Sequence, residues 1–68
     1  MIFADKLKHL RALAGYTQHQ VAQYLKTSDS CYRNYENGIR EPSLAVLKEI
    51  CDFFDVSADY LIGRADEY

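Results

Sequence analysis

The polar side chains best placed to do chemistry in this chain lie between residues 28 and 36. If this segment is a helix, Asp29, Ser30, Arg33 and Asn34 fall on one side of it. A carboxylate, a hydroxyl, a guanidinium and an amide presented together can match the hydrogen-bonding edges of another molecule. Any solvated helix face carries the same residue types, so the pattern acquires meaning only from the elements around it.

Other reactive residue types are too scattered to form a catalytic or metal site. Cys31 and Cys51 occur singly within apolar patterns, which is typical of small buried hydrophobic residues. His9 and His19 are separated by an expected helix boundary and lack a second ligand at metal spacing, so we expect exposed histidines rather than a zinc site. The sequence therefore predicts no enzyme, no cofactor, no metal and no small-molecule ligand.

Length and hydropathy restrict the class of protein further. A chain of 68 residues forms one small domain near the lower limit for independent folding, so an added interface such as that of a homodimer would help. No apolar run reaches the 18 residues needed to span a membrane, and none is suited to start a signal peptide. We expect a soluble cytoplasmic protein, associated with the nucleoid when it is bound there, with no membrane partner.

The net charge of −2 conceals an asymmetry along the chain. Residues 1–40 carry six Lys and Arg against three Asp and Glu, a net charge of +3, whereas residues 41–68 carry two against seven, a net charge of −5. A polyanionic partner would therefore contact the first forty residues, with the acidic part facing away. A mixed-charge surface that keeps a small domain soluble is the alternative explanation.

An amphipathic helix is predicted at the start of the chain by apolar residues at spacings of four and three. These residues are Phe3, Leu7, Leu10 and Ala14. Gly15 follows where a left-handed C-cap is wanted, and Tyr16 can fold back onto the last turn as its apolar contact.

A second helix is predicted from Thr17 to about Leu25. Thr17 and Gln20 have the spacing of a capping box, in which each side chain bonds to the other residue's backbone N–H. Its inward face includes Val21 and Ala22, and the small Ala22 side chain would let another helix cross closely.

A third helix is predicted to begin after the turn 26–28, with Ser28 as its N-cap. Cys31, Tyr32 and Tyr35 form its apolar side. Asn37 and Gly38 end it, because both residue types tolerate positive φ.

The remaining chain predicts two more helices and no strand, since no segment alternates with period two. A loop over 39–42 contains the only proline, and Ser43 caps a fourth helix. The stripe that we expect to pack in the core there comprises Leu44, Leu47, Ile50, Cys51 and Phe54. A short fifth helix opens at 56–59 and stops at Gly63.

The order and spacing of these signals resemble the phage-repressor and Cro type of helix-turn-helix domain, also called the XRE family. The resemblance covers residues 3–64 and rests on Thr17-Gln18, Val21-Ala22, Leu25, Ser28, Tyr35-Glu36-Asn37-Gly38, Arg40-Glu41-Pro42-Ser43, Leu47, Val56-Ser57 and Asp59-Tyr60-Leu61-Ile62-Gly63. It implies an all-α, five-helix, lambda-repressor-like DNA-binding domain over residues 1–64, with the helix-turn-helix motif at about 18–37 and a polar tail at 65–68.

The resemblance implies a sequence-specific regulator of transcription that binds double-stranded DNA. Such domains lay the third helix into the major groove, usually as a homodimer on a palindromic operator, and most simply act as repressors. The residues assigned to DNA by the resemblance are Thr17, Gln18, Ser28, Asp29, Ser30, Arg33, Asn34, Asn37 and Arg40. Gln18, Asn37 and Arg40 would bind phosphates on either side of the groove, Arg33 a base or a phosphate, and the others except the cap Thr17 would face bases.

Several residues depart from the commonest family pattern. Lys26 stands where glycine is usual, so the turn either adopts a left-handed conformation at a cost of about 1 kcal/mol or is reshaped. Tyr32 must fit its ring under the second helix or lean outward. Asp29 would be repelled by phosphate unless it accepts a hydrogen bond from a cytosine amino group. Glu36 is expected to be structural, holding the loop near Arg40.

A second hypothesis keeps the fold but changes the partner. The net negative charge, the acidic second half and Asp29 would also suit a protein-interaction module, either an antitoxin-like or an anti-repressor partner, with weak or no direct DNA binding. The resemblance further implies dimerisation around the fifth helix, through Phe53, Ala58, Ile62 and Tyr68. We single out Phe53 because it lies off the apolar stripe of its own helix.

Overall fold

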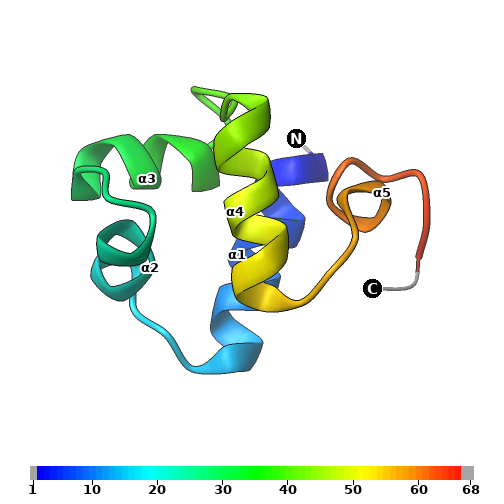
Figure 1. Cartoon of the computed structure of the whole chain (residues 1–68), viewed down its shortest axis with the longest axis horizontal. Helices are drawn as coiled ribbons and strands as arrows, with labels where there is room; N and C mark the ends of the chain where they lie inside the picture. The colour runs from blue at the N-terminus through cyan, green and yellow to red at the C-terminus, as the bar shows by residue number, and fades with distance from the viewer. Residues whose placement is uncertain (1, 67–68) are drawn as a thin grey trace.

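The computed structural model is all-helical over residues 2–66, which are the residues that it describes. It comprises α1 (Ile2–Ala14), α2 (Gln18–Tyr24), α3 (Asp29–Glu36), α4 (Leu44–Phe54) and α5 (Ala58–Leu61). The helices α2 and α3 form one end of the molecule, α1 and α4 occupy its middle, and α5 lies at the other end (Figure 1). The predicted five-helix, all-α fold is confirmed. None of the helices in this part of the chain combines the length and apolar character needed to cross a membrane.

Hydroxyl side chains begin four of the five helices. The N-caps Thr17, Ser28, Ser43 and Ser57 each accept a hydrogen bond from the backbone N–H three residues later. At Thr17 the capping box is complete, because the Thr17 N–H donates to Gln20 Oε1 over 2.8 Å. These bonds satisfy amides that the helices leave unpaired. The predicted starts of α2, α3 and α4 are therefore confirmed.

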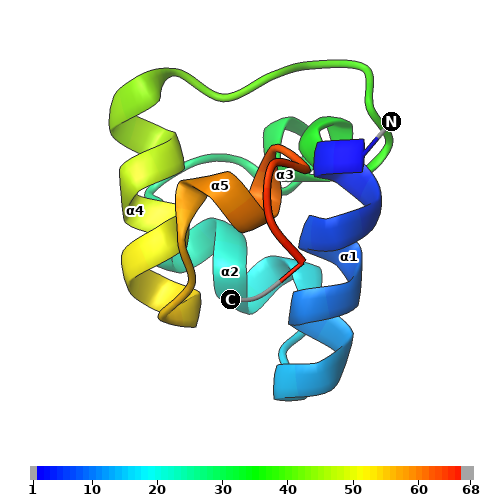
Figure 2. The same ribbon diagram turned by 90° about the vertical axis from the view of Figure 1, so that its right-hand side faces the viewer.

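The C-terminal turn of α1 differs from its prediction. Phe3, Leu7 and Leu10 are buried as expected, but Ala14 is exposed and Ala4 is buried in its place. Figure 2 shows that the last turn of α1 extends past the other helices, and Ala14 there lines only an open hollow with Phe54, Asp55 and Val56. The predicted glycine cap beyond this turn is confirmed, since Gly15 has a φ of 79°.

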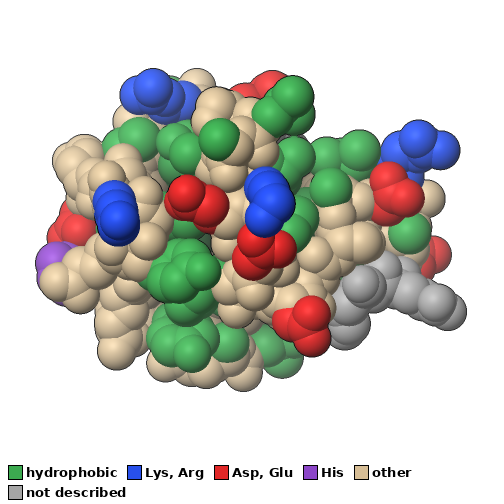
Figure 3. Space-filling view, in the orientation of Figure 1, with side chains coloured by type: hydrophobic (Ala, Val, Ile, Leu, Met, Phe, Trp, Pro, Cys, Tyr) green, Lys and Arg blue, Asp and Glu red, His purple; other side chains and the backbone are tan. Residues whose placement is uncertain are grey.

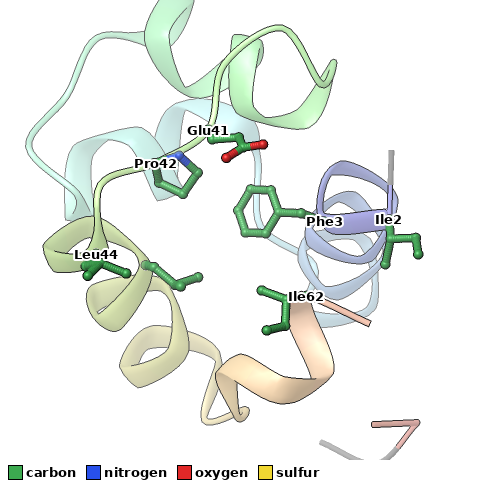
Figure 4. A pocket seen from close by; sticks show the side chains of 7 residues that line it. Ile2, Phe3, Glu41, Pro42, Leu44 and Ile62 are labelled. Atoms are coloured by element: carbon green, nitrogen blue, oxygen red, sulfur yellow. The ribbon is translucent and has the colours of Figure 1, made fainter. Parts of the chain in front are cut away.

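The stripe on α4 was also predicted too long. Ile50 is fully buried, whereas Leu47, Cys51 and Phe54 are half-buried and Leu44 is 84% exposed. Leu44 lies in the first turn of α4, at the rim of an open apolar groove between the beginnings of α1 and α4 and the end of α5 (Figure 4). The residues that line this groove are Ile2, Phe3, Glu41, Pro42, Leu44, Leu47 and Ile62.

The turn between α2 and α3 contains a strained residue. Lys26 has a φ of 58°, so of the two alternatives at this position the turn adopts the left-handed conformation. The left-handed conformation costs an L-residue about 1–2 kcal/mol, and glycine avoids this cost. Glycine also makes the unfolded chain more flexible, which cancels roughly half of the stability that the substitution would otherwise gain. We expect Lys26→Gly to raise the free energy of unfolding by about 0.5–1 kcal/mol, measured by urea denaturation.

A second left-handed residue provides the control for that measurement. Asp55 has a φ of 55° at the C-cap of α4. Aspartate tolerates this region better than lysine, because its short polar side chain bonds to the local backbone. Asp55→Gly should therefore stabilise the protein less than Lys26→Gly, and equal or reversed gains would contradict this account of the turn.

Candidate nucleic-acid interface

The helices α2 and α3 pack closely through small and buried side chains. Val21, Ala22 and Tyr32 have no exposed surface, and Leu25 is only 6% exposed. The Thr27 N–H donates to the Ala22 carbonyl over 3.0 Å, which closes the turn after α2. The predicted inward face of α2 is confirmed, and the pair forms a compact unit in which the turn fixes how α3 is presented.

The outward side of α3 is polar, as its sequence predicts. Asp29, Ser30 and Arg33 are exposed and Asn34 is half-buried. The carbonyl of Asn34 accepts hydrogen bonds from the N–H groups of Ile39 and Arg40, over 3.0 and 3.3 Å. The backbone of Asn34 thus holds the chain that follows α3 against the end of the helix.

The inward side of α3 is buried at both tyrosines but only half-buried at Cys31, which we expected to be buried. Tyr32 and Tyr35 are 0% and 5% exposed, so the Tyr32 ring fits inside the fold rather than leaning outward. Cys31 is half-buried, and neither it nor Cys51 forms a disulfide. Within residues 2–66, no cluster of His, Cys, Asp and Glu side chains could hold a metal ion.

An open polar hollow lies beside the first turns of α2 and α3. It is lined by Arg11, Tyr16, Thr17, Gln18, His19, Asp29 and Arg33. Four of the predicted site residues therefore come together here, namely Thr17, Gln18, Asp29 and Arg33. Ser28 and Ser30 flank Asp29 on the chain, while Asn34, Asn37 and Arg40 are not part of the hollow and belong to the far end of α3. Arg11, Tyr16 and His19 are lining residues that the sequence did not indicate.

A buried carboxylate joins α1, α2 and α3 behind this hollow. Glu36 is 2% exposed and accepts hydrogen bonds from Arg11 Nε at 2.6 Å, Arg11 Nη2 at 3.2 Å, the Tyr32 hydroxyl at 2.6 Å and Gln18 Nε2 at 3.1 Å. The structural role predicted for Glu36 is confirmed, but the expected position near Arg40 was wrong. Its charged partner is Arg11, which is 25 residues away and could not be identified from local spacing.

These contacts keep the carboxylate ionised inside the protein. Burial by itself raises the pKa of Glu36, but the hydrogen bonds from Arg11, Tyr32 and Gln18 outweigh it and hold the pKa below the usual 4.5. Burial and the neighbouring Glu36 raise the pKa of Tyr32, so its hydroxyl stays protonated and donates. The same network orients Gln18, whose amide nitrogen keeps one more N–H to donate elsewhere.

Asp29 also has a partner that the sequence did not reveal. His19 Nδ1, in the first turn of α2, lies 2.8 Å from Asp29 Oδ1 and 3.0 Å from Oδ2. The two side chains are 60% and 48% exposed, so the prediction of an exposed His19 is confirmed. Both residues occupy first turns of consecutive helices, and this shared position was the only sequence signal for their contact.

Phe53 contacts aromatic rings of its own chain. Its ring centroid lies 4.9 Å from that of Tyr16, 4.5 Å from Tyr24 and 4.9 Å from Phe54. Figure 3 shows hydrophobic side chains gathered between α2 and α4, where this cluster lies. Phe53 is half-buried by these contacts and not fully buried, so it stays a candidate for the predicted dimer surface, and Tyr16 packs on α4. Tyr68 lies outside the described residues.

Comparison with known proteins identifies a family and several relatives. The helix-turn-helix family model matches residues 7–61. The chain is 36% identical over 64 residues to the HTH-type transcriptional regulator ImmR of Bacillus subtilis, covering 94% of this chain and 50% of ImmR. It is 38% identical over 60 residues to the regulator AnsR of the same organism, covering 88% of this chain and 52% of AnsR.

A phage-derived protein is similar over the same region. The cryptic phage CTXphi transcriptional repressor RstR of Vibrio cholerae is 33% identical over 64 residues, covering 94% of this chain and 57% of RstR. The chain thus spans about half the length of ImmR, AnsR and RstR.

Proposed function

This chain belongs to the helix-turn-helix family of transcription regulators, and we propose from that premise that it binds a specific operator in double-stranded DNA. The observation that carries the proposal is the exposed polar side of α3 next to a hollow that contains two arginines. A protein of this kind reads base edges with one helix and fixes its position with contacts to phosphates on either side.

In the proposed complex α3 lies in the major groove. Asp29, Ser30 and Asn34 face base edges together with the cap Ser28, because these side chains supply both donors and acceptors. Arg33 contacts a base or the adjacent phosphate. Its position one turn after Asp29, on the exposed side of α3, supports this assignment.

Phosphate contacts bracket the reading helix in this proposal. Gln18 donates its second amide N–H to a phosphate at one edge of the groove, supported by the orientation that Glu36 gives it. Asn37 and Arg40 bind the backbone at the other edge, and both are exposed. Lys26 adds a cation in the turn between α2 and α3.

We further propose that the protein acts as a homodimer on a palindromic site. The apolar groove supports this, because three of its lining residues, Ile2, Leu44 and Ile62, are 58%, 84% and 49% exposed. The groove shares no residue with the polar hollow, so a second copy could cover it while both reading helices stay accessible. Burial of this surface would add apolar contacts to a core that is small for independent folding.

Repression follows from occupancy alone in this proposal. A dimer bound at a promoter excludes polymerase without any chemical step. The similarity to RstR, which is named a transcriptional repressor, supports repression as the first outcome to test.

Selection of ligands from random duplex DNA tests this function, and titration of the selected duplex tests the expected dependence of binding on salt. We expect an enriched palindrome whose half-sites lie about one helical turn apart. If Lys26, Arg33 and Arg40 of each subunit neutralise phosphates, affinity should fall about 10³-fold between 50 and 200 mM salt. Titration of the selected duplex by fluorescence anisotropy at several salt concentrations provides the measurement.

Paired variants separate this interface from the rest of the surface. Arg33→Ala combined with Arg40→Ala should weaken binding and flatten the salt dependence, whereas Arg64→Ala, which removes an exposed cation from the acidic half, should change neither. Failure to enrich any sequence, or a flat salt dependence for the unmodified protein, would favour the protein-interaction hypothesis instead.

A further inference from the structure

We propose that His19 is a specificity-determining residue, which acts by holding the Asp29 carboxylate toward a base that presents an amino group in the major groove. The inference rests on the proposed DNA-binding function. The family resemblance assigns base contacts only to Ser28 and to residues of α3. The inference adds a residue of α2 to the set that determines which bases are bound.

The geometry of the pair is the first support. His19 Nδ1 lies within 3.0 Å of both carboxylate oxygens of Asp29. Because an ionised carboxylate can only accept, the proton of this hydrogen bond is on His19 Nδ1. One donor shared by two oxygens leaves most of the carboxylate's lone-pair positions unused, so Asp29 can accept a further hydrogen bond from a base.

The position of the pair is the second support. His19 belongs to α2 and Asp29 to α3, and both line the open hollow beside the reading helix. The imidazole therefore fixes the direction of the carboxylate relative to both helices, rather than leaving it to the rotamers of Asp29 alone. Even exposed pairs of charged side chains contribute little to folding stability, so stabilisation of the fold is a weak explanation for this exposed contact.

Electrostatics gives the third support. A bare carboxylate at the tip of α3 would be repelled by phosphates, and a donated imidazole proton offsets part of that charge. The other charged groups at the hollow are Arg11 and Arg33, together with the buried Glu36 behind it. Arg11 is engaged by Glu36, and Arg33 forms no ion pair with Asp29 within the described residues, so His19 is the group that contacts Asp29 directly.

The chemistry of Asp29 then selects the base. Cytosine and adenine present amino donors in the major groove, whereas the major-groove groups of guanine and of the thymine carbonyl only accept. We therefore expect cytosine or adenine at one position of each half-site. His19 should increase the preference for these bases at that position without altering the base preferences at the other positions of the half-site.

A double-mutant cycle on the selected sequence tests the inference. The four proteins are the wild type, His19→Ala, Asp29→Ala and the double variant, each titrated against the selected duplex and duplexes changed at single positions. We expect His19→Ala to reduce discrimination at the Asp29 position at least about fivefold, the lower end for one good base contact. In the Asp29→Ala background, removal of His19 should have no further effect there.

Two further variants exclude a merely structural role. His19→Gln retains an amide donor and should restore part of the discrimination, while His9→Ala removes an exposed histidine of α1 and should leave it unchanged. Thermal denaturation of each variant by circular dichroism establishes that the compared proteins are folded.

The possible results separate this inference from the proposed function. If the wild type selects a palindrome and His19→Ala selects the same one with equal discrimination, the inference fails while DNA binding stands. It fails also if His19→Ala has the same effect with and without Asp29. If the wild type selects nothing, the proposed function fails and the inference falls with it.

Discussion

Replacement of Glu36 by alanine is expected to destabilise the protein by about 3–5 kcal/mol. The loss is large because Arg11 would keep a charge that Glu36 no longer balances, and the buried Tyr32 hydroxyl would lose its acceptor. Small domains have total stabilities near the lower end of about 5–15 kcal/mol. We therefore expect Glu36→Ala to be only marginally stable at 25 °C, with a much lower urea midpoint than the wild type, as measured by far-ultraviolet circular dichroism and urea titration.

Glu49→Ala is the matched control for this experiment. Glu49 is an exposed carboxylate on α4, and its removal should change the free energy of unfolding by less than about 0.5 kcal/mol. A loss below about 1 kcal/mol for Glu36→Ala would show that the buried network contributes little to the fold.

The same carboxylate predicts how stability depends on acid. Hydrogen bonds to Arg11, Tyr32 and Gln18 overcome the effect of burial and hold the folded-state pKa of Glu36 below its usual 4.5. A group whose pKa is lowered by folding stabilises the protein above the unfolded value, and this contribution is lost as the pH falls through the folded value. The contribution of Glu36 should thus be complete at neutral pH and decline below about pH 4.5. Urea titrations across this range provide the measurement.

Enlargement of Ala22 should have the second largest effect. Ala22 is fully buried where α2 packs against α3, and the Thr27 N–H bonds to its carbonyl at the start of the turn. We expect Ala22→Leu to cost about 1–3 kcal/mol through overpacking. Because the extra atoms would also separate the two helices, affinity for the selected operator should fall further than the loss of folded protein explains.

The control for Ala22→Leu is the same substitution on an exposed helix surface. Ala45→Leu lies in the first turn of α4, where its side chain is exposed, and should leave stability and DNA affinity nearly unchanged. If Ala22→Leu folds as stably as the wild type and binds the operator equally well, then neither stability nor DNA binding requires the close approach of α2 and α3.

Local signals in the sequence predicted most of the fold. Each capping residue acts within three or four positions, so Thr17, Ser28 and Ser43 could be identified without knowledge of the tertiary structure. At Lys26 the sequence left two turn conformations open, and the structure adopts the left-handed one.

Contacts between distant segments could not be predicted in this way. The partner of Glu36 lies on α1, and the partner of Asp29 lies one helix earlier, so only the packing of α1, α2 and α3 brings these groups together. The exposure of Leu44 and Ala14 could not be predicted either, because an apolar stripe in the sequence does not show where the neighbouring helices end in the fold. The predicted DNA contacts themselves remain to be tested by the binding experiments above.

The Glu36 network has a consequence for how the protein can diverge. A change at Arg11, Gln18 or Tyr32 leaves Glu36 short of a donor, so tolerated substitutions at these positions should be strongly non-additive and appear as sets. Ser30 and Arg33 lie outside that network and are exposed. Substitutions on the outer side of α3 can therefore change a binding preference with little loss of stability. Substitutions at Gln18 also disturb the buried hydrogen bonds of Glu36.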